Sequence, residues 1–114
     1  MEKQNLIVDL TLEFALEVIT YTEKLEESKK FVIAKQLLKS ATSIGANVRE
    51  AQNAESKADF IHKLKIASKE AGETEYWLTL CESSSTYPKP DNLKEKLASI
   101  TNIISKIIFT SKTR

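Results

Sequence analysis

The sequence predicts an all-α protein, an antiparallel up-down-up-down four-helix bundle. Four segments repeat apolar residues at steps of three and four, which places those residues on one face of a helix. The 114 residues include only two Gly and two Pro, too few for the many turns of a β-sandwich or barrel. The composition, 41% apolar and 29% charged, is ordinary for a globular chain, and we expect one domain over residues 1–114.

The first expected helix runs from about Leu6 to Leu25 and ends at the polar residues 26–30. Its predicted core stripe is Leu6, Leu10, Phe14, Val18, Tyr21 and Leu25. A second apolar set widens this face: Ile7, Val8, Leu12, Ala15 and Ile19. An apolar face this wide indicates burial on more than one side.

The second expected helix runs from about Phe31 to Ala54. Its predicted core stripe is Ala34, Leu37, Leu38, Ala41, Ile44 and Val48. Gly45 lies in the middle of this helix, where glycine costs about 1 kcal/mol relative to alanine. A close contact with a neighbouring helix at Gly45 would explain that residue.

A polar stripe lies beside the apolar stripe of the second helix. Its members follow steps of three and four: Ser40, Ser43, Asn47 and Glu50. The stripe is either the boundary of a solvated face or a network in which Asn47 and Glu50 link to another helix or another subunit. A polar residue at such a seam fixes register and oligomeric state.

The third expected helix opens at Ser56, where the Ser-Lys-Ala-Asp sequence that ends at Asp59 has the form of a capping box. Its predicted core stripe is Phe60, Leu64, Ala67, Ala71, Thr74, Leu78 and Cys81. A second apolar stripe consists of Ile66, Trp77 and Leu80. A bundle core needs only one stripe, so this second one is a candidate contact with another chain, with Trp77 as its aromatic anchor.

Residues 83–92 form the one long loop, because Pro88 and Pro90 break helices there. Asp91 is placed to cap the fourth helix. That helix is expected to bury Leu93, Leu97, Ile100, Ile104, Ile107 and Ile108.

No group of residues has the spacing of a catalytic or metal site, and we expect neither enzymatic activity nor a cofactor. His62, the single histidine, falls on a face that should be solvated. Cys81, the single cysteine, falls on the core stripe, where a thiol behaves as a small hydrophobic group. The absence of a signal-peptide pattern and of an apolar run of about 20 residues predicts a cytoplasmic protein without a membrane or small-molecule partner.

The charges are strongly segregated although the formal net charge is only +1. Residues 1–28 carry two Lys and seven acids, and residues 70–92 carry one Lys and five acids. Residues 29–69 carry nine Lys or Arg and three acids, and residues 93–114 carry five Lys or Arg and one acid. The candidate phosphate-binding residues lie in the basic segment: Lys35, Lys39, Arg49, Lys57, Lys63, Lys65 and Lys69.

Two uses of this basic segment remain open. The lysines could contact the phosphates of a duplex or folded RNA by shape, which needs no aromatic stacking. Alternatively, they could pair with the acidic helices of another subunit. Only 7% of residues are aromatic and none lies between the lysines, so stacking on single strands is disfavoured.

The sequence resembles the four-helix bundle family of proteins encoded in 23S rRNA intervening sequences, over about residues 6–110. The helix-two pattern Ser-Ile-x-x-Asn-hydrophobic-x-Glu is matched by Ser43, Ile44, Asn47, Val48 and Glu50. The helix-three pattern of Phe, hydrophobic-Ala and Glu before a leucine-rich end is matched within residues 59–67 and 69–78. The usual Gly after the Asn-x-x-Glu element is replaced by Ala51 and Gln52.

The resemblance implies an all-α bundle that forms homo-oligomers, with pentamers known in the family. Relatives of the family include the accessory proteins of diversity-generating retroelements, basic rings that work with RNA and reverse transcriptase. The resemblance therefore favours a homo-oligomer that contacts structured RNA or a ribonucleoprotein, with Asn47, Glu50, Ile66 and Trp77 as candidate assembly residues. The alternative is a protein-interaction scaffold that binds no nucleic acid.

Overall fold

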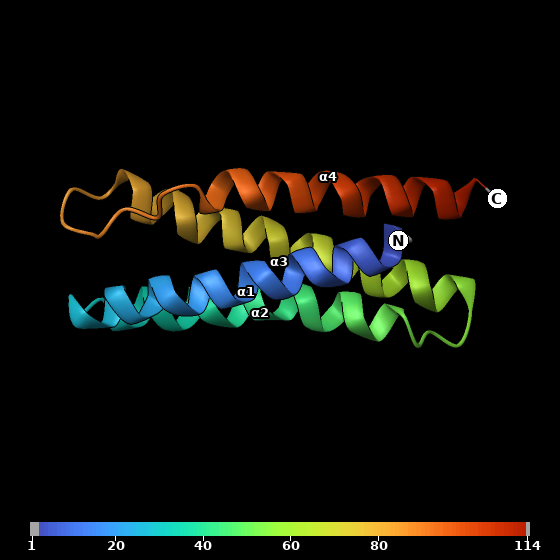
Figure 1. Ribbon diagram of the computed structural model, residues 1–114, viewed down its shortest axis with the longest axis horizontal. Coiled ribbons are helices and arrows are strands. Elements are labelled where there is room, and N and C mark those ends of the chain that lie inside the picture. Colours follow the sequence, from blue (N-terminus) through green and yellow to red (C-terminus); the bar gives the residue numbers. More distant parts are fainter. Residues whose placement is uncertain (1–2, 114) are drawn as a thin grey trace.

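The computed structural model describes residues 3–113, with side chains from residue 6 onward. Four helices follow one another along the chain: α1 (Lys3–Glu27), α2 (Phe31–Ala51), α3 (Lys57–Ser83) and α4 (Leu93–Lys112). Each helix packs against its neighbours in sequence, and α1 also packs against α4. The result is the expected antiparallel four-helix bundle, in which the α1–α2 edge lies opposite the α3–α4 edge (Figure 1).

The core follows the predicted stripes of α2, α3 and α4 closely. In α3 the buried residues are Leu64, Ala67, Ala71, Thr74, Leu78 and Cys81. Among the predicted core residues, Leu38 of α2, Phe60 of α3 and Ile108 of α4 are only half-buried. Burial of Leu, Ile, Val and Phe side chains stabilises the fold by roughly 1.5–3 kcal/mol each.

The core stripe of α1 differs at its start from the prediction. Leu6 is 40% exposed and Leu10 is half-buried, whereas Ile7 and Thr11 are buried. At about 100° per residue, Ile7 lies almost directly in line with Phe14, two turns later, but Leu6 lies well to one side. Thr11 tolerates burial because its hydroxyl donates to the Ile7 carbonyl at 2.8 Å, so its hydrogen-bonding group is satisfied.

The turn between α1 and α2 closes without glycine. Lys29 has a φ of 63°, and the amides of Lys29 and Lys30 donate to the carbonyls of Glu26 and Leu25 at 2.9 and 2.8 Å. These two bonds are the Schellman pattern, in which a left-handed residue follows the helix. The short turn then forces α2 to run antiparallel to α1.

The capping box of α3 is confirmed. The Ser56 hydroxyl accepts from the Asp59 amide at 3.0 Å, and the Asp59 carboxylate accepts in return from the Glu55 amide at 3.2 Å. The α2 helix ends at Ala51, three residues before the predicted end at Ala54. The amides of residues 52–54 donate to carbonyls three residues back, instead of the four of an α-helix.

The expected cap of α4 by Asp91 is wrong. Asp91 has a φ of 50°, and the residue at the cap position is Asn92, which makes no side-chain cap hydrogen bond. The loop is held from outside the helix: the Tyr21 hydroxyl donates to the Pro88 carbonyl at 2.6 Å. Lys89 donates to the carbonyls of Glu82 and Ser84 at 3.0 and 2.6 Å, which satisfies acceptors at the end of α3.

Candidate nucleic-acid interface

The predicted basic residues lie at the surface, but the bundle does not gather them on one face. Six of the seven are exposed, and Lys63 is half-buried. They divide between α2, which carries Lys35, Lys39 and Arg49, and α3, which carries the other four. The two groups therefore lie on different helices of the bundle.

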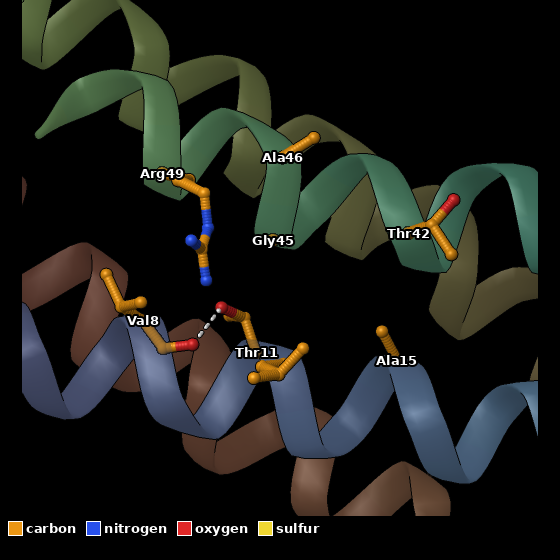
Figure 2. Close-up of a pocket in the computed structure, with 8 residues that line it drawn as sticks. Val8, Thr11, Ala15, Thr42, Gly45, Ala46 and Arg49 are labelled. Carbon is orange, nitrogen blue, oxygen red and sulfur yellow. Dashed lines mark hydrogen bonds between the residues drawn. The ribbon is translucent and has the colours of Figure 1, made fainter. Parts of the chain in front are cut away.

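The α2 group borders the edge between α1 and α2. Lys35 and Lys39 line a groove of about 580 Å³ together with Phe31 and Leu38. Arg49 lines a smaller groove of about 150 Å³ between the same two helices. Figure 2 shows its side chain reaching from α2 towards Thr11 on α1, where the Thr11 hydroxyl donates to the Val8 carbonyl. The guanidinium group therefore lies over the helix junction.

The same close-up explains the glycine of α2. Gly45 faces Thr11 across the helix junction (Figure 2), and a Cβ added to Gly45 would lie 3.5 Å from the Thr11 Cβ and Oγ1. A methyl group would therefore be in ordinary van der Waals contact, and a larger side chain would push α1 away. The expected close approach of a neighbouring helix at Gly45 is confirmed.

Lys63 makes an ion pair across α2 and α3. Its Nζ lies 3.0 Å from Oε1 of Glu50. The hydrogen bond to Glu50, and then the attraction of that carboxylate, raise the pKa of Lys63. The pair is solvent-accessible, and exposed pairs of this kind contribute little to stability. Lys63 is thus partly neutralised within its own chain.

Lys65 and Lys69 lie on the exposed side of α3. Lys65 has a basic neighbour from the far end of the chain, because the side chain of Lys112 on α4 lies close enough for the two ammonium groups to interact. That proximity, and then the repulsion between the two ammonium charges, lower the pKa of Lys112. A second basic cluster therefore consists of Lys65 and Lys112, which come together from α3 and α4, and Lys69, one turn further along α3. The α3–α4 edge lies opposite the α1–α2 edge that carries the α2 group (Figure 1).

The candidate assembly residues occupy different environments. Asn47 donates to the Ser43 carbonyl of its own helix at 2.9 Å, and Glu50 holds Lys63. Ile66 is half-buried. Trp77 packs partly against the core, and its Nε1 donates to Oε2 of Glu73 at 3.2 Å. The polar contact that crosses between helices in the buried interior is Ser40 with Thr74, whose hydroxyl oxygens lie 2.8 Å apart.

An exposed apolar stripe on α1 was missed as a surface feature. Leu12, Leu16 and Ile19 are 49%, 56% and 38% exposed, and they lie on the outer side of α1, away from Phe14. The sequence signal for it was the excess width of the apolar face of this helix. Helical spacing alone does not distinguish a second buried side from an exposed one.

His62 is exposed and Cys81 is buried, as expected. Burial raises the pKa of the Cys81 thiol, while its contact with Tyr21 acts in the opposite direction. Among the described residues, no group of three or more His, Cys, Asp or Glu side chains could hold a metal ion. None of the helices within residues 3–113 is long and apolar enough to cross a bilayer.

The family comparison agrees with the helix pattern of the chain. The model of the 23S rRNA-intervening sequence protein family matches residues 3–108. The chain belongs to this family. A solved structure of an S23 ribosomal protein family member from Bacteroides thetaiotaomicron VPI-5482, described as a protein of unknown function, is 42% identical. It superposes with a TM-score of 0.89, and the match covers 95% of this chain and 99% of the other.

None of the curated proteins matches the chain. Membership of the 23S rRNA-intervening sequence protein family therefore identifies the fold and the lineage. The biochemical role has to be inferred from the surface of the bundle.

Proposed function

We propose that this protein is a non-enzymatic, homo-oligomeric helical bundle that associates with structured RNA or a ribonucleoprotein. The observation that carries the proposal is the set of exposed cations on two opposite edges. Among the side chains of residues 6–113, no carboxylate lies within ion-pair distance of Lys35, Lys39, Arg49, Lys65 or Lys69. Such cations are available to phosphates, and each phosphate contact releases condensed counterions.

Oligomerisation would multiply this modest charge. A ring, such as the pentamer that the family resemblance implies, repeats both basic edges in each subunit and raises avidity without any new kind of contact. RNA that binds along the repeated basic edges of such a ring is recognised by its shape and through its backbone. This mode of recognition does not require aromatic side chains. The near-neutral total charge of a single chain is therefore compatible with RNA association.

The family setting supports an RNA partner. The chain belongs to the 23S rRNA-intervening sequence protein family, and the similar solved structure is assigned to an S23 ribosomal protein family. One description names 23S rRNA and the other a ribosomal protein family, although the solved relative has no assigned function. They make ribosomal RNA, or a particle that contains it, the first partner to test.

The apolar stripe on α1 supports self-association. Leu12, Leu16 and Ile19 would leave a substantial apolar surface in contact with water if the chain stayed monomeric. A second copy is the occupant that fits this surface best, because acidic α1 and basic α2 lie side by side. Two copies could bury the stripe and still pair Glu13 or Glu23 of one copy with Lys35 or Lys39 of the other.

The proposal is tested by binding to a folded ribosomal RNA fragment across a salt series. We expect the logarithm of affinity to fall linearly with the logarithm of salt concentration, by about 0.7–0.9 per phosphate contact. The triple variant Lys35→Glu, Lys39→Glu, Lys69→Glu should lower affinity at least tenfold and flatten the slope.

A control with the same change in charge is Lys24→Glu, Lys29→Glu, Lys106→Glu, at exposed positions outside the two basic clusters. Equal loss of affinity in both triple variants would show only a nonspecific effect of net charge. Unchanged affinity in the first variant would remove RNA association as the function.

The alternative is a protein-interaction scaffold without a nucleic-acid role. The exposed stripe of Leu12, Leu16 and Ile19 favours it, since apolar patches mark protein contacts. The two functions are separated by the same titration: a stable oligomer that binds no RNA even at low salt would support the scaffold.

A further inference from the structure

Two ammonium groups meet on the α3–α4 edge. Lys65 of α3 and Lys112 of α4 lie close enough that Lys65 lowers the pKa of Lys112, and both side chains are exposed. Among the side chains of residues 6–113, no carboxylate lies within ion-pair distance of either one. Like charges this close repel each other, and an anion that accepts from both would relieve the repulsion.

A groove begins one helical turn from Lys65 on the same edge. It has a volume of about 210 Å³ and lies between α3 and α4. Its lining is small and polar near the lysines, with Ser68 and Gly72 on α3 facing Thr101 and Asn102 on α4. Glu75 closes the far end. An extended anionic ligand would therefore have its charge at the lysine end and its neutral part along the groove.

Gly72 has no packing role within the chain. A Cβ added to it would meet nothing within 4 Å, in contrast to Gly45, which faces α1. Glycine destabilises a helix interior, and one of its uses is to let a ligand approach the backbone closely. The open position of Gly72 is thus an observation independent of the charges, and it leaves room for an occupant to approach the backbone of α3.

We propose that the α3–α4 groove binds the sugar–phosphate backbone of RNA. A phosphate lies between Lys65 and Lys112, with Lys69 beside it, and the strand continues along the groove so that a ribose further along the chain of the RNA lies over Gly72, two helical turns from Lys65. Ser68, Thr101 and Asn102 offer hydroxyl and amide groups to the ribose 2′-hydroxyl, the group that distinguishes RNA from DNA. This assignment rests on the proposed RNA association and specifies one of its binding sites. An apolar helix face of another protein would leave the lysine pair without a counter-charge, whereas the RNA backbone supplies one at each phosphate, so RNA is favoured.

Two substitutions test the site with different readouts. Lys112→Ala removes one phosphate contact, so affinity for a hairpin of about 16 base pairs should fall on the order of fivefold and the salt slope should fall by about one. Gly72→Gln fills the groove without changing the charge, so affinity should fall several-fold while the slope changes little. A DNA hairpin of the same sequence should bind more weakly than the RNA hairpin to the unmodified protein.

Matched controls come from the far side of α4. Lys106 and Ser99 are exposed, and Lys106 lies about a third of the helix circumference away from Lys112. Lys106→Ala and Ser99→Gln should leave the affinity unchanged. Circular dichroism and the mass of the assembly, recorded for each variant, separate loss of the site from loss of the fold or of the oligomer.

The outcomes distinguish this site from the proposed function. If the unmodified protein binds RNA and both variants bind as tightly as it does, the groove assignment is overturned while RNA association stands. If Lys112→Ala or Gly72→Gln lowers the mass of the assembly instead of the RNA affinity, the groove is a subunit contact and the assignment is again overturned. If the unmodified protein binds no RNA at low salt, both proposals fall.

Discussion

Single buried residues link distant parts of this chain through hydrogen bonds that its hydropathy does not show. Tyr21 of α1 is 5% exposed, donates to the Pro88 carbonyl and contacts Cys81 of α3. Burial, and then the contact with Cys81, raise the pKa of Tyr21, and burial raises the pKa of Cys81. Both groups therefore hold their protons more tightly in the folded protein than in the unfolded chain.

These shifts predict a loss of stability at alkaline pH. The folded state holds the two protons more tightly than the unfolded state, so the stabilisation is complete below the unfolded pKa values. It declines as the pH rises above about 8.5, the ordinary pKa of cysteine, and further near 10, that of tyrosine. Urea denaturation at a series of pH values measures this decline. Cys81→Ala removes the thiol contribution and should flatten the first part of the curve; an identical curve for the variant would contradict the prediction.

Most of each helix was predictable because its residues act locally. The periodicity of α2, α3 and α4 identified their core stripes, and the Ser56–Asp59 cap depends on side chains only three residues apart. Asp91 failed as a cap because its backbone conformation is set by the loop, which is held by Tyr21 of α1 and by the hydrogen bonds of Lys89 to the end of α3. Thr11 was not predicted in the core because its side chain is polar. It can be buried because its hydroxyl donates to the Ile7 carbonyl.

The two helical glycines are predicted to respond in opposite ways to larger side chains. Gly72→Ala should stabilise the protein by about 1 kcal/mol, since alanine is the better helix former and its Cβ meets nothing within 4 Å. Gly45→Leu should destabilise it by about 1–3 kcal/mol, because the side chain overpacks the contact with Thr11. Thermal or urea unfolding of the two variants provides the comparison. A destabilised Gly72→Ala variant would indicate that the groove contains a contact absent from the monomer.

The candidate site was only partly predictable because it depends on how whole helices meet. The sequence indicated a basic segment, but the bundle places Lys35, Lys39 and Arg49 on one edge and Lys65 and Lys69 on the other. Lys112 joins the second cluster from nearly 50 residues further along the chain. The spacing of residues within one helix predicts which face of the helix each residue occupies. It does not predict which other helix packs against that face.

The whole bundle presents chemically different edges, which determines where a second copy could bind. The exposed apolar residues of α1, Leu12, Leu16 and Ile19, lie on the outer side of that helix, whereas the lysines Lys65 and Lys112 lie on the opposite edge of the bundle. If the α1 stripe holds subunits together, the α3–α4 edge of every subunit stays available to RNA. If Trp77 holds them together instead, the contact lies on α3.

This difference leads to a prediction about assembly. The double variant Leu12→Glu, Leu16→Glu should reduce the mass measured by light scattering to the 12.9 kDa of one chain, because buried carboxylates without partners strongly disfavour an interface. Both residues point away from the core, so circular dichroism should be unchanged, and Thr20→Glu, on the exposed side of the same helix, should leave the mass unaltered.

A reduced mass in Trp77→Ala, together with an unchanged mass in the leucine variant, would move the interface to α3. An unmodified protein that is already monomeric at micromolar concentration would remove the homo-oligomer from the proposed function, and each basic edge would then have to bind RNA without the avidity of a ring.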